Sequence, residues 1–402
     1  MNAAVGTAGG RVAAVTDADM ADMAGPPDMP DVPDMADLVG RARAVLTDHW
    51  RPPGFCVPHA DVYPVLFLWD SCFHVVIWAA LGEVERATSE LRSVFLAQTE
   101  AGFVPHMAYL LAPEASVAFW GRRGSSTITQ PPMYGHAVAE MVRRDLPVPG
   151  DLLEAAERGL RWLLDHRRLP DGSIAVVHPW ETGMDDSPRW DHALTGGWTR
   201  AGWYRRKGEL VDSLVLDAEG VAVDNPAFRL GPAGFTALVA FNLLELGDAT
   251  RRPDLVALGH DLGASIEDRF DGGGWSDGGP ASVRTLDGLL PLLVLDRDAD
   301  RLISSLVDPS AFSGRYGPAF LHRAEPAYDP TSYWRGSVWA QMTYLMWLVA
   351  RRHGAADVAD ELAAGLRRGV STSGFAEHWH PDTGAGYGAT PLSWDGLVAV
   401  VA

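Results

Sequence analysis

Apolar residues recur at helical spacing along almost the whole chain, and this periodicity restricts the fold more than any other feature. Strand patterns are scarce, and the best of them cover 172–177 and 214–222. The predicted helices span 36–50, 66–81, 84–98, 133–144, 151–166, 191–194 (a short turn), 226–246, 253–270, 283–295, 299–307, 332–352, 355–368 and 392–401. Because no Pro/Ser-rich linker follows residue 36, we expect one all-α domain over 37–402. A solenoid of helical hairpins is the alternative, but no repeat of fixed length supports it.

The first 36 residues differ in composition from the rest of the chain. They repeat Asp-Met pairs with interspersed prolines and lack the basic start and apolar run of a signal peptide. We therefore expect residues 1–36 to form a disordered acidic tail. No apolar run of about 18 residues is present, so no transmembrane helix is predicted. Two cysteines, Cys56 and Cys72, are too few for a disulfide framework and indicate reduced thiols in a cytoplasmic protein.

The charge balance excludes several kinds of partner. The formal net charge is −19, which opposes binding to nucleic acid or to an anionic membrane because both need clustered Lys and Arg. No Cys/His cluster has the spacing of a zinc site, and no metal or other cofactor is expected. Whether the chain forms a homo-oligomer is left open by the sequence.

The segment HPWETGMDDSPRWD (178–191) places four carboxylates, two tryptophans and an arginine within one short stretch. Gly183 and Pro188 argue against a regular helix, so the segment is predicted to be a loop. Crowding like charges beside large aromatics costs folding energy, which favours a functional site over a scaffold. The candidate carboxylates here are Glu181, Asp185, Asp186 and Asp191, although Asp186 and Asp191 also suit turn or cap positions.

The fifteen tryptophans indicate a carbohydrate ligand. Most stand in loops or at helix ends, beside Asp, Glu, Gln and Arg, where flat rings suit the apolar C–H faces and polar rims of sugars. Half-buried packing residues are the alternative for individual positions. Glycosidic hydrolysis needs two carboxyl groups in different protonation states, and a second carboxylate, Glu377, lies between Phe375 and Trp379 far along the chain. A surface glutamate is the alternative there, and Asp382 in Pro-Asp-Thr-Gly suits a turn.

Seven segments together resemble glycoside hydrolase family 63, specifically its bacterial mannosylglycerate/glucosylglycerate hydrolase group. They are YPVLFLWDSCFH (63–74), GFVPHM (102–107), ITQPP (128–132), the segment 178–191, YWRGSVW (333–339), EHWHPDTG (377–384) and LSWD (392–395). They occur in the family's order and cover nearly everything after residue 40. Each alone is weak, but their combination is specific for the fold and the catalytic apparatus.

The resemblance implies an (α/α)6 barrel and an inverting α-glycosidase. Asp185 would be the general acid, and Glu377 the general base that positions water. Residues implied to bind the cleaved sugar or complete its wall are Tyr63, Phe67, Trp69, Asp70, Gln130, Trp180, Glu181, Gly183, Trp334, Arg335 and Trp394. One hypothesis is that Arg335 pairs with Glu181 or with a substrate hydroxyl, and a structural ion pair is the alternative.

The sequence also departs from the family. Asp186 stands where Asn is common, and its charge is expected to raise the pKa of Asp185 if the two are close. Thr182 stands where the family often has Ser, and His378 and His380 replace aromatic or acidic residues near the leaving-group side.

The run 203–207 is the most basic short stretch of this acidic chain. One hypothesis is that Arg205 or Arg206 binds an anionic leaving group such as a glycerate carboxylate, and a solvated surface run is the alternative. The expected substrate is a small α-glucoside or α-mannoside, with glucosylglycerate and mannosylglycerate as candidates. A neutral α-glucoside, a sugar epimerase or isomerase using His378 and His380, and a sugar-binding pseudoenzyme stay open.

Overall fold

The computed structural model describes residues 34–277, 279 and 282–401. Residues 1–33 of the predicted acidic tail lie outside the described residues, so the disorder of the tail stays a prediction. Helix α1 (Met35–Asp48) begins inside the predicted tail, because the Asp34 carboxylate accepts a hydrogen bond from the Ala36 amide (3.2 Å) and caps the helix. None of the described helices is long and apolar enough to cross a membrane.

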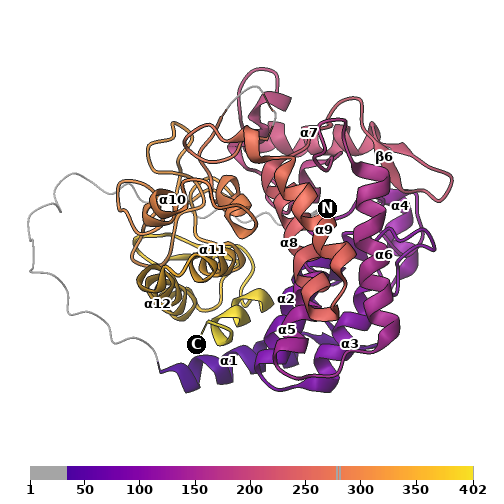
Figure 1. The fold of residues 1–402 in the computed structure, drawn as a ribbon, viewed down its shortest axis with the longest axis horizontal. Helices are drawn as coiled ribbons and strands as arrows, with labels where there is room; N and C mark the ends of the chain where they lie inside the picture. Colours follow the sequence, from indigo (N-terminus) through magenta and orange to yellow (C-terminus); the bar gives the residue numbers. More distant parts are fainter. Residues whose placement is uncertain (1–33, 278, 280–281, 402) are drawn as a thin grey trace, which may run out of the picture. The chain divides into compact units, whose positions relative to one another are not determined.

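Six elements of the described chain form a closed inner ring, in which each contacts the next and the last returns to the first. The α-helices of this ring are labelled in Figure 1. In order they are α2 (Leu68–Ala80), α5 (Tyr134–Arg143), α8 (Ala233–Thr250), η5 (Leu286–Leu293), α11 (Ala340–Arg352) and η6 (Ser393–Ala399). Every residue of α2 from Leu68 to Ala79 is buried, as expected for an inner helix that other elements surround. The ring confirms the predicted all-α (α/α)6 architecture.

Outer helices cover this ring and contribute one amphipathic face each. Helix α1 packs on η6, α3 (Val84–Val94) on α2, α6 (Gly150–Arg167) on α5 and α8, α9 (Pro253–Ala264) on α8, and α12 (Ala356–Ser373) on α11. Helix α10 (Ala299–Ser305) lies in the chain between η5 and α11. The remaining short helices are η1 (Pro113–Ser116), α4 (Val117–Trp120), η2 (Pro179–Thr182), η3 (Pro188–Ala193) and η4 (Glu267–Arg269).

The described residues form four two-stranded antiparallel sheets outside the helices. They pair β1 (Trp50–Arg51) with β2 (Phe55–Cys56), β3 (Leu66–Phe67) with β4 (Met107–Ala108), β5 (Val215–Leu216) with β6 (Ala222–Asp224), and β7 (His378–Trp379) with β8 (Gly386–Tyr387). The predicted strand 214–222 is thus a short hairpin. The predicted strand 172–177 is wrong, since this stretch makes isolated bridges at Ile174 and Val176.

Two inner positions of the ring are 3-10 helices, where ordinary helices were predicted. In η5, Pro291 lies inside the predicted helix, and because proline has no backbone N–H it interrupts the α-helical hydrogen bonds. The predicted helices 226–246 and 332–352 begin later, at Ala233 and Ala340, so the residues before them are free to serve as loops.

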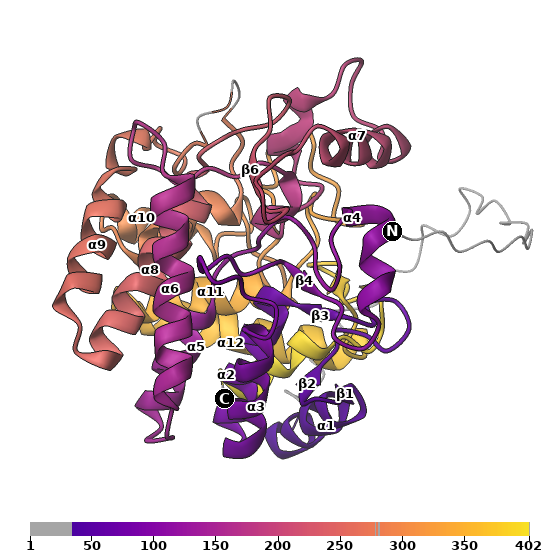
Figure 2. The same cartoon turned by 90° about the vertical axis from the view of Figure 1, so that its right-hand side faces the viewer.

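Helix α7 (Arg200–Asp212) was not predicted at all. Its buried residues are Trp203, Lys207 and Leu210, too few apolar positions to give a clear stripe. Thr199 caps it by accepting a hydrogen bond from the Gly202 amide (3.1 Å). Figure 2 shows α7, α4 and β6 in the upper half of that view.

Candidate active site

The Glu377 carboxylate is held by three donors. Its Oε1 accepts hydrogen bonds from the hydroxyls of Tyr63 (2.9 Å) and Tyr333 (3.0 Å), and its Oε2 accepts one from the Ala389 amide (2.9 Å). Burial raises the pKa of Glu377 above its usual range, and these hydrogen bonds oppose the rise because they stabilise the ionised form. A Cβ on Gly388 would lie 2.4 Å from Oε2, so the neighbouring backbone also fixes the carboxylate.

Asp185 follows η2 and has a half-buried side chain. Burial raises the pKa of Asp185 to about 7, the negative charges of Asp186 and Glu377 add to the rise, and the Lys207 ammonium opposes it. A carboxyl with this pKa is substantially protonated near neutral pH, which is the state that a general acid requires.

The backbone around Asp185 is fixed by side chains from three segments. The carbonyl oxygens of residues 184–186 accept hydrogen bonds, in order, from Nε1 of Trp190 (2.9 Å), Nε1 of Trp203 (2.9 Å) and Nη1 of Arg335 (3.1 Å). Trp190 lies in η3 and Trp203 in α7. The loop is therefore positioned although it lacks regular secondary structure.

Asp186 is almost fully buried and pairs with the Lys207 ammonium (2.5 Å). The expectation that Asp186 raises the pKa of Asp185 is confirmed in direction. Lys207, which sequence reasoning did not single out, has the larger and opposite effect on this pKa. Arg335 pairs with Asp191 through two hydrogen bonds (3.0 and 2.5 Å), which is the structural ion pair kept as the alternative, and its pairing with Glu181 is wrong.

Glu181 has a structural position. Arg167 donates to both of its oxygens (3.0 and 2.9 Å), and the amides of Thr129 (3.2 Å) and Val177 (2.6 Å) donate one hydrogen bond each. The Glu181 side chain has no exposed surface. Its predicted contact with a sugar is replaced by a role in holding the loops, because every oxygen is already partnered.

The residues expected around the cleaved sugar are brought together. The rings of Tyr63 and Phe67 meet edge to face at 5.8 Å, and Oε1 of Gln130 accepts a long hydrogen bond from the Trp69 amide (3.4 Å). Burial raises the pKa of Asp70 to about 8, with added effects from the two catalytic candidates, so its carboxyl is largely neutral at pH 7. A neutral carboxyl can both donate to and accept from a sugar hydroxyl.

An aromatic wall adjoins this group. Trp394 contacts Trp69 (6.2 Å between centroids) and Trp339 (5.9 Å), and Trp339 stacks on Trp334 at 3.8 Å. Trp334 has a φ of 58°, a left-handed conformation that strains an aromatic residue and is typical of functional sites. Trp180 is half-buried, and its ring centroid lies 5.8 Å from Nζ of Lys207.

Gly183 offers no side chain. Its role is to let the backbone approach the Trp69 ring, which a Cβ would meet at 2.6 Å.

The basic run divides among different environments. Arg205 is exposed, whereas Arg206 donates a hydrogen bond to the Ala193 carbonyl (3.0 Å). His378 stacks on Trp339 at 4.8 Å, and burial, followed by the charge of Arg200, lowers the pKa of His378 to about 3. A neutral His378 does not suit acid–base work with His380.

Sequence reasoning gave no individual role to several residues that the structure places here. They are Tyr333, Trp339, Trp203, Lys207 and Asp395. Tyr333, Trp339 and Asp395 fall inside segments that carried the family resemblance, which is the signal that could have identified them. Asp395 is fully buried, burial raises its pKa well above the usual range, and neither carboxylate oxygen has a hydrogen-bond partner among the described residues.

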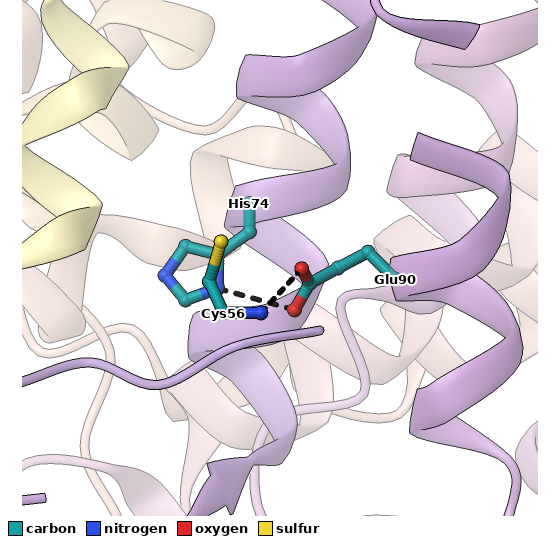
Figure 3. A group of neighbouring side chains, drawn as sticks. All are labelled: Cys56, His74 and Glu90. Atoms are coloured by element: carbon teal, nitrogen blue, oxygen red, sulfur yellow. Dashed lines mark hydrogen bonds and ion pairs between the residues drawn. The ribbon is translucent and has the colours of Figure 1, made fainter. Parts of the chain in front are cut away.

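One group of side chains within the described residues has the composition of a metal site (Figure 3): Cys56, His74 and Glu90, whose ligand atoms lie within 4.8 Å of one another. Each is already partnered. Glu90 accepts from the Cys56 amide (2.7 Å) and lies 3.3 Å from Nδ1 of His74, while Nε2 of His74 lies 2.6 Å from the Ser393 hydroxyl. We interpret the group as a buried hydrogen-bond network that joins α3, α2 and η6.

A helical toroid that carries a buried and a half-buried carboxyl group beside an aromatic wall is typical of a glycoside hydrolase. Comparison with known proteins bears this out. A family model described as the mannosylglycerate hydrolase MGH1-like glycoside hydrolase domain matches residues 63–394. The chain therefore belongs to the MGH1-like glycoside hydrolases, in agreement with the resemblance read from the sequence.

Curated relatives and solved structures agree with this family. A mannosylglycerate hydrolase of Thermus thermophilus is 28% identical, over 86% of this chain and 96% of the relative. A glucosylglycerate hydrolase of Mycolicibacterium hassiacum is 28% identical, over 83% of this chain and 90% of the relative. The crystal structure of a family 63 mannosylglycerate hydrolase from Thermus thermophilus superposes with a TM-score of 0.79 at 26% identity, covering 90% of this chain and 99% of that one.

Proposed function

We propose that this glycoside hydrolase cleaves the α-glycosidic bond of a small anionic glucoside or mannoside, glucosylglycerate or mannosylglycerate, with inversion at the anomeric carbon. The observation that carries the proposal is the contrast between the two carboxyl groups. Asp185 has a pKa of about 7 and suits a proton donor, whereas the Glu377 carboxylate accepts hydrogen bonds from two tyrosine hydroxyls.

In this mechanism Asp185 gives its proton to the glycosidic oxygen as the bond to the anomeric carbon breaks. Glu377 accepts a proton from a water molecule whose oxygen attacks the opposite face of that carbon. The hydroxyls of Tyr63 and Tyr333 orient the Glu377 carboxylate toward this water, and the neutral Asp70 carboxyl binds a sugar hydroxyl. Trp69 and Trp394 present apolar surface to the sugar ring.

An anionic leaving group needs a local cation, because the chain as a whole carries a net charge of −19. On α7, Lys207 is paired with Asp186 and Arg206 with a backbone carbonyl. The positive charge of Arg200 helps to lower the pKa of His378, which stacks on the aromatic wall next to Glu377 in the chain. We therefore place Arg200 ahead of Arg205 as the partner of the glycerate carboxylate.

The function is tested by following the hydrolysis of glucosylglycerate, mannosylglycerate and neutral α-glucosides by proton NMR. We expect the free β-anomer as the first product, from one of the two glycerate conjugates. First release of the α-anomer would contradict inversion, and faster cleavage of a neutral α-glucoside would contradict the anionic leaving group. An isomerised sugar without cleavage, or binding without product, would identify an epimerase or a pseudoenzyme.

The leaving-group partner is tested with Arg200→Ala, and Arg205→Ala and Arg206→Ala serve as matched variants on the same helix. We expect the KM for the glycerate conjugate to rise about tenfold in Arg200→Ala, with little change for a neutral glucoside. A rise confined to Arg205→Ala or Arg206→Ala would return the role to the residue first considered from the sequence.

A further inference from the structure

Lys207 is the only lysine in a sequence that contains 33 basic residues, Lys and Arg together. The chain uses arginine at every other cationic position, on its surface and in its buried ion pairs alike. This single lysine is almost fully buried, on the helix α7 that packs beside the acid loop. The question is therefore why this one buried position holds a lysine when all others hold arginine.

The surroundings of the Lys207 ammonium are compact. Its Nζ lies 2.5 Å from Oδ1 of the buried Asp186, 4.4 Å from the centroid of the Tyr204 ring and 5.8 Å from that of Trp180. An ammonium is a small point charge that satisfies such a site, whereas the planar guanidinium fork needs more room and more acceptors. The site therefore selects lysine by shape.

The pair also connects α7 to the general acid along the chain. Lys207 and Trp203 stand one helical turn apart on α7, and they bind consecutive residues of the loop: Trp203 binds the carbonyl of Asp185, and Lys207 binds the carboxylate of Asp186. The Asp186 carbonyl is held in addition by Arg335. A shift of the Lys207 ammonium would thus be transmitted directly to the residue that carries the proton.

We propose that Lys207 is a positioning residue for the hydrolysis, whose ammonium holds Asp186 and, together with Trp203, fixes the placement and the charge environment of the Asp185 carboxyl. This inference rests on the proposed role of Asp185 as general acid. Among the residues that the structure describes, the charged groups that act on Asp185 are Lys207, Asp186 and Glu377. Lys207 and Asp186 carry opposite charges, so removing Lys207 alone should raise the pKa of Asp185 and removing Asp186 alone should lower it.

The first test is the pH dependence of kcat/KM for Lys207→Met, Asp186→Asn and the double variant. The basic limb of this profile is the fall in activity at high pH. Loss of the ammonium should move the basic limb up by about one pH unit, and loss of the carboxylate should move it down. The double variant, in which no buried charge is left unpaired, should lie near the wild-type limb while kcat falls about tenfold. Lys207→Arg keeps the charge, so it should restore the limb more fully than it restores kcat.

A second measurement does not depend on turnover. Because the chain has one lysine, protein labelled with ¹⁵N-lysine gives a single Nζ signal. We expect this signal to titrate with the same midpoint as the basic limb of wild type, and the transition to vanish in Asp185→Asn. Thermal unfolding of each variant shows whether a loss of activity reflects loss of the fold.

The outcomes separate this inference from the proposed function. If Asp185→Asn keeps wild-type activity, the general-acid assignment is wrong and the proposed mechanism fails with it. If Asp185→Asn is inactive while Lys207→Met and Asp186→Asn leave the basic limb in place or move it in the same direction, only the role of Lys207 is overturned. A Lys207→Met protein that does not fold leaves the decision to the double variant and to the NMR titration.

Discussion

The two carboxyl groups proposed to be catalytic are held in opposite ways. Glu377 is fixed through its own carboxylate, since both oxygens accept hydrogen bonds from Tyr63, Tyr333 and the Ala389 amide. Asp185 is fixed through its backbone, and its carboxyl accepts no hydrogen bond from any residue that the structure describes. The difference matches the two proposed tasks. A base must stay ionised and aligned with water, whereas an acid must keep its proton available to the leaving oxygen.

Removing either carboxyl should give the largest effect. Asp185→Asn and Glu377→Gln should each lower kcat about 1,000-fold on the natural substrate. A glycosyl fluoride, whose leaving group needs no proton, should restore much of the activity of Asp185→Asn and little of that of Glu377→Gln. Equal rescue of both variants, measured as fluoride release, would remove the distinction between the two roles.

Placing a side chain against the Glu377 carboxylate should have the next largest effect on kcat. Gly388→Ala would place a Cβ 2.4 Å from Oε2 of Glu377, and we expect kcat to fall about 100-fold. The matched control is Gly354→Ala, because Gly354 has a similar φ (70°, against 76° at Gly388) and no atom within 4 Å of the added Cβ. Both variants carry the backbone strain, so steady-state kinetics on the pair isolates the contact with Glu377. A similar loss in both would show that strain alone is responsible.

Tyr333→Phe should have a smaller effect on the same carboxylate. It removes one hydroxyl that stabilises the ionised form of Glu377, so the pKa of Glu377 should rise and the acid limb of the pH profile should move up. We expect about a tenfold loss of kcat below the optimum and an unchanged basic limb. Movement of the basic limb instead would couple Tyr333 to the acid.

The wild-type profile itself sharpens the comparison. In the proposed mechanism activity requires a protonated Asp185, so we expect activity to fall as the pH rises through about 7. It also requires an ionised Glu377, whose pKa lies above its usual 4.5, so activity should fall again in mildly acidic solution. The measurement is kcat/KM across pH 4 to 9 with buffer controls. An activity that stays constant up to pH 9 would exclude Asp185 as the group that limits the basic side.

Much of the fold was predictable because helical periodicity is a local property. The inner helix over 68–80 and the outer helix over 150–167 were predicted within two residues at each end, since each has a consistent apolar pattern. Helix α7 was missed because it buries only Trp203, Lys207 and Leu210. The 3-10 geometry of η5 and η6 was also missed, because the apolar pattern does not distinguish the two kinds of helix.

The candidate site was predictable in its residue types and less so in its contacts. Asp185 and Glu377 were chosen from sequence, and the structure brings each into the surroundings that its proposed task needs. Glu181 appeared equally suited to a sugar contact, and only its four hydrogen bonds reveal a structural position. Arg335 could not be paired from sequence, because its partner Asp191 is 144 residues away.

By itself the sequence determined the all-α class of the fold and the tryptophan-rich loops, because periodicity and composition are local properties of the chain. Its resemblance to family 63 singled out the two candidate carboxylates. Only the tertiary structure revealed that burial raises the pKa of Asp185 to about 7, that three hydrogen bonds oppose the rise in the pKa of Glu377, and that the single lysine pairs with Asp186 beside Asp185. These properties depend on burial and on charges brought together from distant segments. A pKa is set by the neighbours that folding supplies, and the linear order of residues does not contain them.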